Sequence, residues 1–184
     1  MANIGIYGGT FNPPHKGHML AAVQCRTALG LERVLVIPAA VPPHKALFDG
    51  SPDAATRLRM TELAVQGLDG FEVSDVELRR EGPSYTVDTL RELSAQHPGE
   101  TLSLMMGTDM FLSFADWREP EQIAQLAQIV CFARTAIDET LRAQLQEQAE
   151  RLRIKFGAKV TLLHNEFLDI SSTEARRLLF FGLA

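Results

Sequence analysis

Residues 3–37, with the sequence NIGIYGGTFNPPHKGHMLAAVQCRTALGLERVLVI, contain the pattern that decides the fold. The stretch begins and ends with a short apolar run typical of a buried strand, at Asn3–Tyr7 and at Arg33–Ile37. Between these runs, Gly17–Leu29 has helical spacing, and Gly30 follows it as a C-cap. A strand, a helix and a second strand in this order predict one unit of a parallel sheet.

The same alternation continues to the end of the chain. Further strands are predicted at Phe71–Val76, Leu102–Met106, Ile129–Ala133 and Lys159–Leu163. Further helices are predicted at Asp53–Val65, Ser84–Gln96 and Asp138–Phe156. We therefore predict an α/β fold, a doubly wound, Rossmann-like parallel sheet with helices on both faces. Because no repeat or linker interrupts the pattern, we expect a single domain over residues 1–184.

Composition argues against two classes of partner. The 184 residues carry a net charge of −5, which disfavours nucleic acid and anionic membranes, so bound phosphate must be held by a local cluster of donors. The chain shows no basic leader and no apolar run of 18 residues, which predicts a cytoplasmic protein. Cys25 and Cys131 lie in apolar stretches, which favours buried reduced thiols over a disulfide or a metal site.

Unusual polar and glycine-rich segments each follow a predicted strand. They are Gly8–His18, Ile37–Lys45, Gly107–Asp109 with the later Trp117, and Asp169–Arg176. Open parallel sheets bind ligands beyond the carboxyl ends of their strands, so we expect these segments to meet in one site.

The first segment favours phosphate binding. Gly8 and Gly9 let a ligand approach the backbone closely, and a helix starting near Lys16 offers free amides and a positive dipole end. His15 and His18 are three residues apart, so both rings can point the same way and donate hydrogen bonds to phosphate oxygens. An ordinary turn is the alternative. A zinc site would need a third ligand, which is not evident at the expected spacing.

The last segment offers a second set of phosphate donors. Ser171, Ser172 and Thr173 stand at another predicted helix start, and Arg176 follows in its first turn, a combination that suits the tail of a triphosphate. The alternative is a simple N-cap. Neither a kinase-like P-loop nor a G-x-G-x-x-G dinucleotide motif occurs in the chain.

With these two segments, the sequence resembles the nucleotidyltransferases of the α/β-phosphodiesterase superfamily. Its H-x-G-H motif is His15-Lys16-Gly17-His18, and its I-S-S-T-x-x-R motif is Ile170–Arg176. The resemblance is fuller to the bacterial nicotinate mononucleotide adenylyltransferases. It extends over Gly8–His15, Val41–Lys45, Pro83–Thr86 with Thr89-Leu90, and Gly107–Asp109 with Trp117.

The resemblance implies transfer of AMP from ATP to nicotinate mononucleotide, with Mg²⁺ arriving on the ATP and no dedicated metal ligands in the protein. The residues implied in catalysis are His15, His18, Lys45 and Arg176. Those implied to bind ATP are Gly8, Gly9, Thr10, Phe11, Gly107, Asp109, Ser171, Ser172 and Thr173. Those implied to bind the mononucleotide are His44, Tyr85, Thr86, Trp117, Arg118 and Arg134.

Alternatives remain both for the roles of single residues and for the reaction as a whole. Trp117 is also consistent with a core aromatic, Tyr85 with a packing residue, and Arg134 with an ordinary surface arginine. The acceptor is alternatively nicotinamide mononucleotide or pantetheine phosphate, although enzymes for the latter usually carry Thr in place of the first histidine. A nucleotide-binding module without turnover is the rival from another class.

The C-terminal residues predict a contact between copies of the chain. Phe180 and Phe181 are adjacent on a helix expected to begin near Ser172, so their side chains point about 100° apart and cannot both face one core. We expect one of them, with Leu183, to pack at a homo-oligomer contact.

Overall fold

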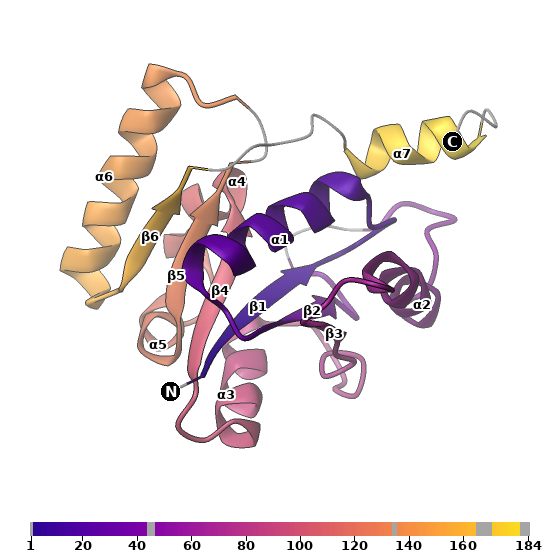
Figure 1. Cartoon of the computed structure of the whole chain (residues 1–184), viewed down its shortest axis with the longest axis horizontal. Coiled ribbons are helices and arrows are strands. Elements are labelled where there is room, and N and C mark those ends of the chain that lie inside the picture. Colours follow the sequence, from indigo (N-terminus) through magenta and orange to yellow (C-terminus); the bar gives the residue numbers. More distant parts are fainter. Residues whose placement is uncertain (1, 44–46, 134–135, 165–170, 181–184) are drawn as a thin grey trace.

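A computed structural model describes residues 2–43, 47–133, 136–164 and 171–180 of the chain. Its centre is a six-stranded sheet of order β3-β2-β1-β4-β5-β6, in which every neighbouring pair is parallel (Figure 1). The strands are β1 (Asn3–Gly9), β2 (Arg33–Pro38), β3 (Phe71–Val73), β4 (Thr101–Gly107), β5 (Gln128–Phe132) and β6 (Val160–Leu163). This is the strand order of a Rossmann-like sheet, which confirms the predicted fold class.

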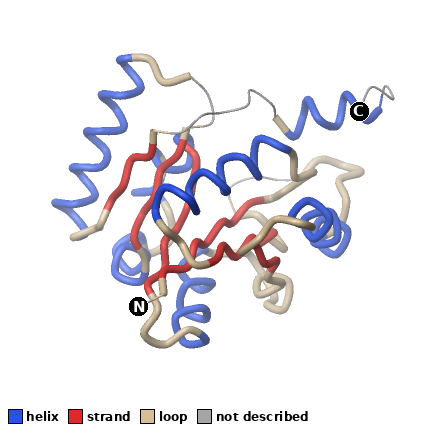
Figure 2. The backbone as a smooth tube through the Cα atoms, in the orientation of Figure 1, coloured by secondary structure: helices blue, strands red, loops and turns tan. Residues whose placement is uncertain are grey.

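Helices cover both faces of this sheet (Figure 2). They are α1 (Lys16–Leu29), α2 (Ala54–Val65), α3 (Thr86–Gln96), α4 (Thr108–Leu112), α5 (Pro120–Leu126), α6 (Glu139–Phe156) and α7 (Ser172–Phe180). One core cluster receives buried side chains from α1 and α2, and a second receives them from α3, α5 and α6. Within the described ranges, no helix combines the length and the apolar character that crossing a membrane requires.

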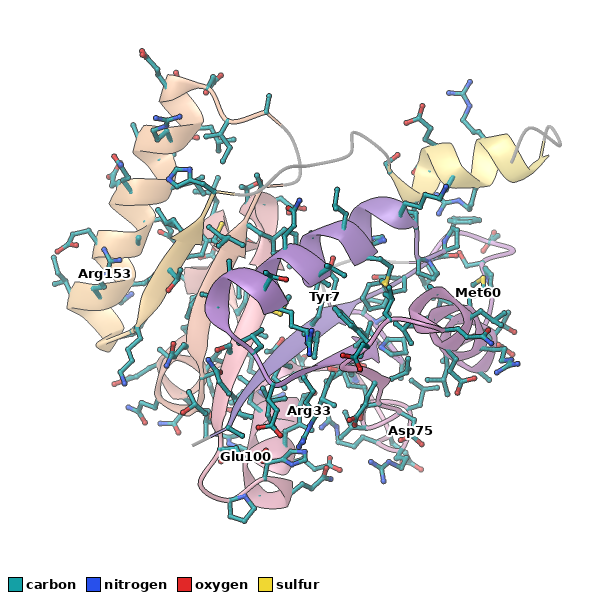
Figure 3. All side chains as sticks on the ribbon, viewed as in Figure 1. Tyr7, Arg33, Met60, Asp75, Glu100 and Arg153 are labelled. Atoms are coloured by element: carbon teal, nitrogen blue, oxygen red, sulfur yellow. The ribbon has the colours of Figure 1, made fainter. Side chains whose placement is uncertain are left out.

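The central strand shows why the core has two halves. Along β1, Ile4 and Ile6 belong to the cluster under α3 and α6, whereas Tyr7 belongs to the cluster under α1. Successive side chains of a strand point to opposite faces, so an apolar run buries both. At the amino-terminal end of the sheet, Arg33 pairs with Glu100 at 3.2 Å (Figure 3). The opposite, carboxyl end is where the predicted site segments lie.

Two predicted helix starts are confirmed by their capping contacts. The Asp53 carboxylate accepts a hydrogen bond from Thr56 N at 2.7 Å, and that of Asp138 accepts one from Leu141 N at 2.7 Å. Gly30, predicted as the C-cap of α1, has a left-handed φ of 59°. These helix ends could be predicted from the sequence because each capping contact involves residues only three or four positions apart.

The predicted strand Phe71–Val76 is too long: β3 ends at Val73. Ser74 N still donates to Val36 O at 3.0 Å, after which the chain turns away from the sheet. Val76 is nevertheless fully buried, because it packs into the core from a turn. Its apolar character therefore reflects burial without strand pairing.

The sequence reasoning also missed the helices between Thr108 and Leu126. This part of the chain contains α4, a 3-10 turn at Phe114–Asp116, and α5. Each has at most seven residues, too few for a helical period to stand out. One signal was present, since Pro120 at the first position of α5 followed by Glu121 is typical of a helix start.

The two cysteines are free and buried, as predicted. Burial raises the pKa of each thiol to about 12, so almost no reactive thiolate exists near neutral pH. We expect iodoacetamide at pH 8 to leave Cys25 and Cys131 unmodified in the native protein and to alkylate both in guanidinium chloride. Mass spectrometry of the intact protein counts the adducts. Rapid native labelling at either position would contradict the closed core.

Candidate active site

The site lies where the direction of the strand order reverses. β1 pairs with β2 on one side and with β4 on the other, so the connections leaving β1 and β4 diverge and open a crevice at their carboxyl ends. Gly8, at the end of β1, is exposed, and a Cβ placed on it would meet no atom within 4 Å. A Cβ on Gly9 would come within 2.9 Å of the Phe11 ring. Gly8 is thus open to a ligand, whereas Gly9 is required by packing.

Phe11 shapes the turn after β1. Its φ of 45° is in the left-handed region that a bulky side chain rarely adopts. The ring is 2% exposed and meets Tyr7 and His18 edge-on, with centroid distances of 5.5 and 5.2 Å. Backbone held in such a conformation is often found beside functional sites.

The two histidines of the first segment lie face to face. Their ring centroids are 3.6 Å apart, with an angle of 31° between the planes. The N–H of His15 donates to His18 Nδ1 at 3.2 Å. In a neutral His18 the accepting Nδ1 carries no proton, so the proton sits on Nε2. The backbone therefore prepares His18 to donate a hydrogen bond from Nε2.

The start of α7 lies against the loop after β1 (Figure 1). Ser172 Oγ donates to Pro13 O at 2.9 Å, across 159 residues of sequence. The Arg176 guanidinium donates to Asn12 O, and it also donates to Thr173 Oγ1 at 3.0 Å. The two phosphate-binding segments predicted from the sequence are thus brought together.

Other contacts at α7 refine that picture. Ser171 Oγ accepts from Glu174 N at 3.1 Å, so Ser171 is an N-cap, the alternative that the sequence left open. The Arg176 guanidinium carbon lies 4.7 Å from the centroid of the Phe48 ring, a cation–π contact. Ile170 and Asp169 lie outside the described residues.

The loop after β2 is held beside the predicted acceptor segment. The amides of Ala40 and Val41 donate to Ser84 Oγ at 3.0 and 3.2 Å, and Ser84 N donates to Val41 O at 2.9 Å. Ser84 was predicted as the first residue of a helix, but α3 begins at Thr86, and Ser84 instead connects two loops. His44, Lys45 and Arg134 lie outside the described residues.

Four of the predicted mononucleotide residues lie around the start of α3. The Arg118 guanidinium carbon lies 4.5 Å from the centroid of the Tyr85 ring. Trp117 is half-buried: its ring packs against Phe114 at 5.4 Å, so one part of the indole belongs to the core. The N–H of Trp117 donates to Phe114 O at 3.1 Å. Thr86, the first residue of α3, presents its amide in the first helical turn, where no intrahelical acceptor exists.

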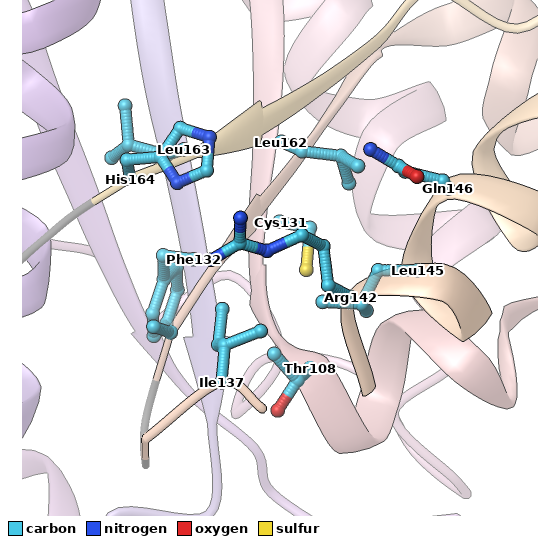
Figure 4. Close-up of a pocket in the computed structure, with 11 residues that line it drawn as sticks. Thr108, Cys131, Phe132, Ile137, Arg142, Leu145, Gln146, Leu162, Leu163 and His164 are labelled. Carbon is cyan, nitrogen blue, oxygen red and sulfur yellow. The ribbon is translucent and has the colours of Figure 1, made fainter. Parts of the chain in front are cut away.

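A cavity of about 140 Å³ lies beyond the ends of β5 and β6 (Figure 4). Its walls include Phe132, Ile137 and Leu162, and its polar groups include Arg142 and His164. Figure 4 shows the Arg142 side chain extending across the cavity toward Phe132. The sequence reasoning did not find this cavity, because β5, β6, α4 and α6 all contribute to it.

The residues after β4 were predicted to bind ATP. Gly107 is buried at the end of the strand, and Asp109 is exposed in the first turn of α4. Thr108, between them, lines the cavity. In the part of the chain that the structure describes, no group of three or more His, Cys, Asp or Glu side chains is placed to hold a metal ion.

Comparison with known proteins yields consistent matches. A model of the cytidylyltransferase-like family matches residues 6–178. A probable nicotinate-nucleotide adenylyltransferase of Citrifermentans bemidjiense is 41% identical, over 94% of this chain and 85% of its own length. One of Salinibacter ruber is 42% identical, over 94% and 83%. A solved Plasmodium falciparum nicotinic acid mononucleotide adenylyltransferase, complexed with NaAD, aligns with a TM-score of 0.73 at 21% identity, over 100% of this chain and 89% of that one.

Proposed function

The chain belongs to the cytidylyltransferase-like family and, within it, to the nicotinate-nucleotide adenylyltransferases, and we propose how its residues carry out that reaction. The enzyme transfers AMP from ATP to nicotinate mononucleotide, giving nicotinate adenine dinucleotide and pyrophosphate. One observation carries the proposal: the start of α7 docks on the loop after β1, next to the paired histidines. Donors from both ends of the chain therefore meet at the loop after β1, where we assign the row of ATP phosphates.

In this proposal, the ATP phosphates lie across the starts of α1 and α7. His18 Nε2–H donates to the α-phosphate, and His15 assists from the stacked position. Arg176, with Ser172 and Thr173, holds the pyrophosphate that leaves. Helix starts and guanidinium groups both favour concentrated negative charge. Lys45 is assigned to the same charge on the resemblance alone.

The chemistry needs no general base. The acceptor phosphate is largely dianionic at neutral pH, because its second pKa is near 6. One of its oxygens forms a bond to the α-phosphorus, and the bond from that phosphorus to the bridging oxygen of the β-phosphate breaks in line. Catalysis then comes from positioning and from donors aimed at the charge that builds up on the α-phosphoryl group and the leaving pyrophosphate. Mg²⁺ is proposed to arrive on ATP, held by phosphates and water.

The remaining parts of the substrates have assigned places. We assign the nicotinate carboxylate to the first-turn amide of α3 at Thr86, with the exposed part of the Trp117 indole against the pyridine ring and Tyr85 and Arg118 beside it. Gly107 and Asp109 are assigned to the ribose of ATP. The cavity beside Thr108 combines apolar walls with the polar groups of Arg142 and His164, and we assign the purine base of ATP to it.

The direct test is a product assay with ATP, Mg²⁺ and three separate acceptors: nicotinate mononucleotide, nicotinamide mononucleotide and pantetheine phosphate. Formation of nicotinate adenine dinucleotide with equimolar pyrophosphate supports the proposal. Turnover of pantetheine phosphate alone would contradict it. Nucleotide binding without product from any acceptor would identify a binding module.

The acid is expected to be the better pyridine substrate. A carboxylate at the α3 amides accepts charge-assisted hydrogen bonds worth roughly 1.5–3 kcal/mol, which corresponds to a preference of about tenfold to over a hundredfold. We expect that ratio between the kcat/KM values for nicotinate and nicotinamide mononucleotide, measured by pyrophosphate release. Equal values would rule out a carboxylate-specific subsite.

A further inference from the structure

A fully buried arginine lies behind the site, and the reaction as described does not use it. Arg57, on α2, is 0% exposed. Its Nη1 donates to Thr10 O at 2.9 Å and to Ala39 O at 2.5 Å, and its Nη2 donates to Ala40 O at 2.9 Å. Thr10 belongs to the loop after β1, and Ala39 and Ala40 to the loop after β2. One guanidinium therefore joins the two loops that border the site.

The loop after β2 is held from both sides. In a trans peptide the C=O and the N–H point in opposite directions. Arg57 donates to the carbonyl oxygens of Ala39 and Ala40. Ser84 Oγ accepts from the N–H groups of the same two peptides, which belong to Ala40 and Val41. The position of this loop is thus set by Arg57 on one side and by Ser84 on the other.

The loop after β1 depends on Arg57 in the same way. Because the carbonyl of Thr10 faces the guanidinium, the N–H of the same peptide, on Phe11, points away from α2. Phe11 is the residue with the left-handed φ of 45°. The hydrogen bond from Arg57 therefore orients the Thr10–Phe11 peptide, which leads into the turn with the left-handed residue.

A buried cation is a poor choice for stability alone. Burial lowers the pKa of the Arg57 guanidinium, and the Asp53 carboxylate offsets this effect only in part. An apolar side chain of similar volume often stabilises such a position as well or better. A planar fork with donors in two directions is, by contrast, well suited to hold three carbonyls of two loops at once.

We propose that Arg57 is a positioning residue for adenylyl transfer, which fixes the ATP-side loop and the acceptor-side loop relative to each other. The proposal rests on the function assigned above. Reacting atoms must meet within a narrow range of distance and angle, so a shift of about 1 Å in either loop costs up to about 10² in rate. Arg57 touches neither substrate and acts through Thr10 and Ala39-Ala40.

The test uses Arg57→Met, Arg57→Lys and a matched control on the same helix. Arg59 is two residues further along α2, and its exposed guanidinium pairs with Glu62 at 2.8 Å. We expect Arg57→Met to lower kcat/KM by tens of times up to about 10², with far-UV circular dichroism unchanged. Arg57→Lys keeps the charge and part of the bonding, so it should recover part of the loss. Arg59→Met should match the wild type.

A second measurement separates this proposal from the assigned reaction. The affinity for MgATP is measured by calorimetry without acceptor, and acceptor binding is followed by the fluorescence of Trp117, the single tryptophan. Arg57→Met should weaken both, by about tenfold each. Ser84→Ala, which releases only the loop after β2, should weaken acceptor binding and leave MgATP affinity unchanged.

The outcomes are distinguishable. If the wild type makes no dinucleotide but Arg57→Lys and Arg57→Met still weaken MgATP binding, the assigned reaction fails and the positioning role stands. Variants that melt earlier but keep wild-type kcat, KM and MgATP affinity would show a structural residue and overturn the proposal. Loss of the fold in Arg57→Lys would also overturn it, because a residue that acts on loop position is not needed for the rest of the core.

Discussion

Replacing His18 with alanine is expected to lower kcat by about 10²–10³, the usual cost of losing one donor aimed at the transition state. The expectation follows from His18 Nδ1, which accepts a hydrogen bond from the His15 N–H and thereby leaves the proton of the neutral ring on Nε2, from which we propose that it donates to the α-phosphate. The ring also rests edge-on against Phe11, so its direction is fixed before substrate binds. Initial rates at saturating ATP and nicotinate mononucleotide measure the effect.

Two comparisons make the His18 result decisive. His97 lies at the amino-terminal end of the sheet, 3.4 Å from the Glu100 carboxylate, so His97→Gln should retain full activity. His15→Ala should raise KM for ATP in addition to its effect on rate, if His15 also binds ground-state phosphates. A His18→Ala protein that unfolds early yet keeps its rate per folded molecule would mark His18 as structural.

Replacing Arg176 with alanine is expected to reduce kcat/KM by about 10³, at the lower end of the range for arginines that stabilise transferring phosphoryl groups. In the free enzyme its guanidinium donates to Asn12 O and contacts the Phe48 ring, so it lies at the loop where we propose that the leaving pyrophosphate binds. Arg176→Lys keeps the charge but loses the bidentate fork, so its kcat/KM should lie between those of the wild type and Arg176→Ala. Steady-state rates at varied MgATP give the values.

The matched control for this prediction is the next residue of the same helix. Arg177 is exposed on α7, so Arg177→Ala should leave kcat/KM unchanged. If Arg176→Ala and Arg177→Ala lose activity equally, the effect comes from the charge or the stability of α7, and the assigned contact with pyrophosphate is wrong.

The sequence predicted which segments meet, because the carboxyl ends of parallel strands lie at one edge of a sheet, but it predicted individual contacts only between residues close in the chain. The face-to-face histidines follow from a three-residue spacing at a helix start, which is why one motif was enough to predict them. Arg57 and Arg59 show the limit. Both are arginines on α2, yet one is fully buried between two loops and the other is exposed. Nothing in their local sequence separates them, because burial is decided by what packs on the helix.

For this protein, the sequence by itself determined the α/β class, the strands and longer helices, the C-cap at Gly30, and the chemistry of the paired histidines. These depend on apolar period, chain stiffness and side-chain type, which act over a few residues. Only the tertiary structure decided the strand order, the seating of Ser172 and Arg176 on the loop after β1, and the link from Arg57 to both loops. Those contacts join residues up to 164 positions apart, and such pairs are selected by the packing of the whole sheet.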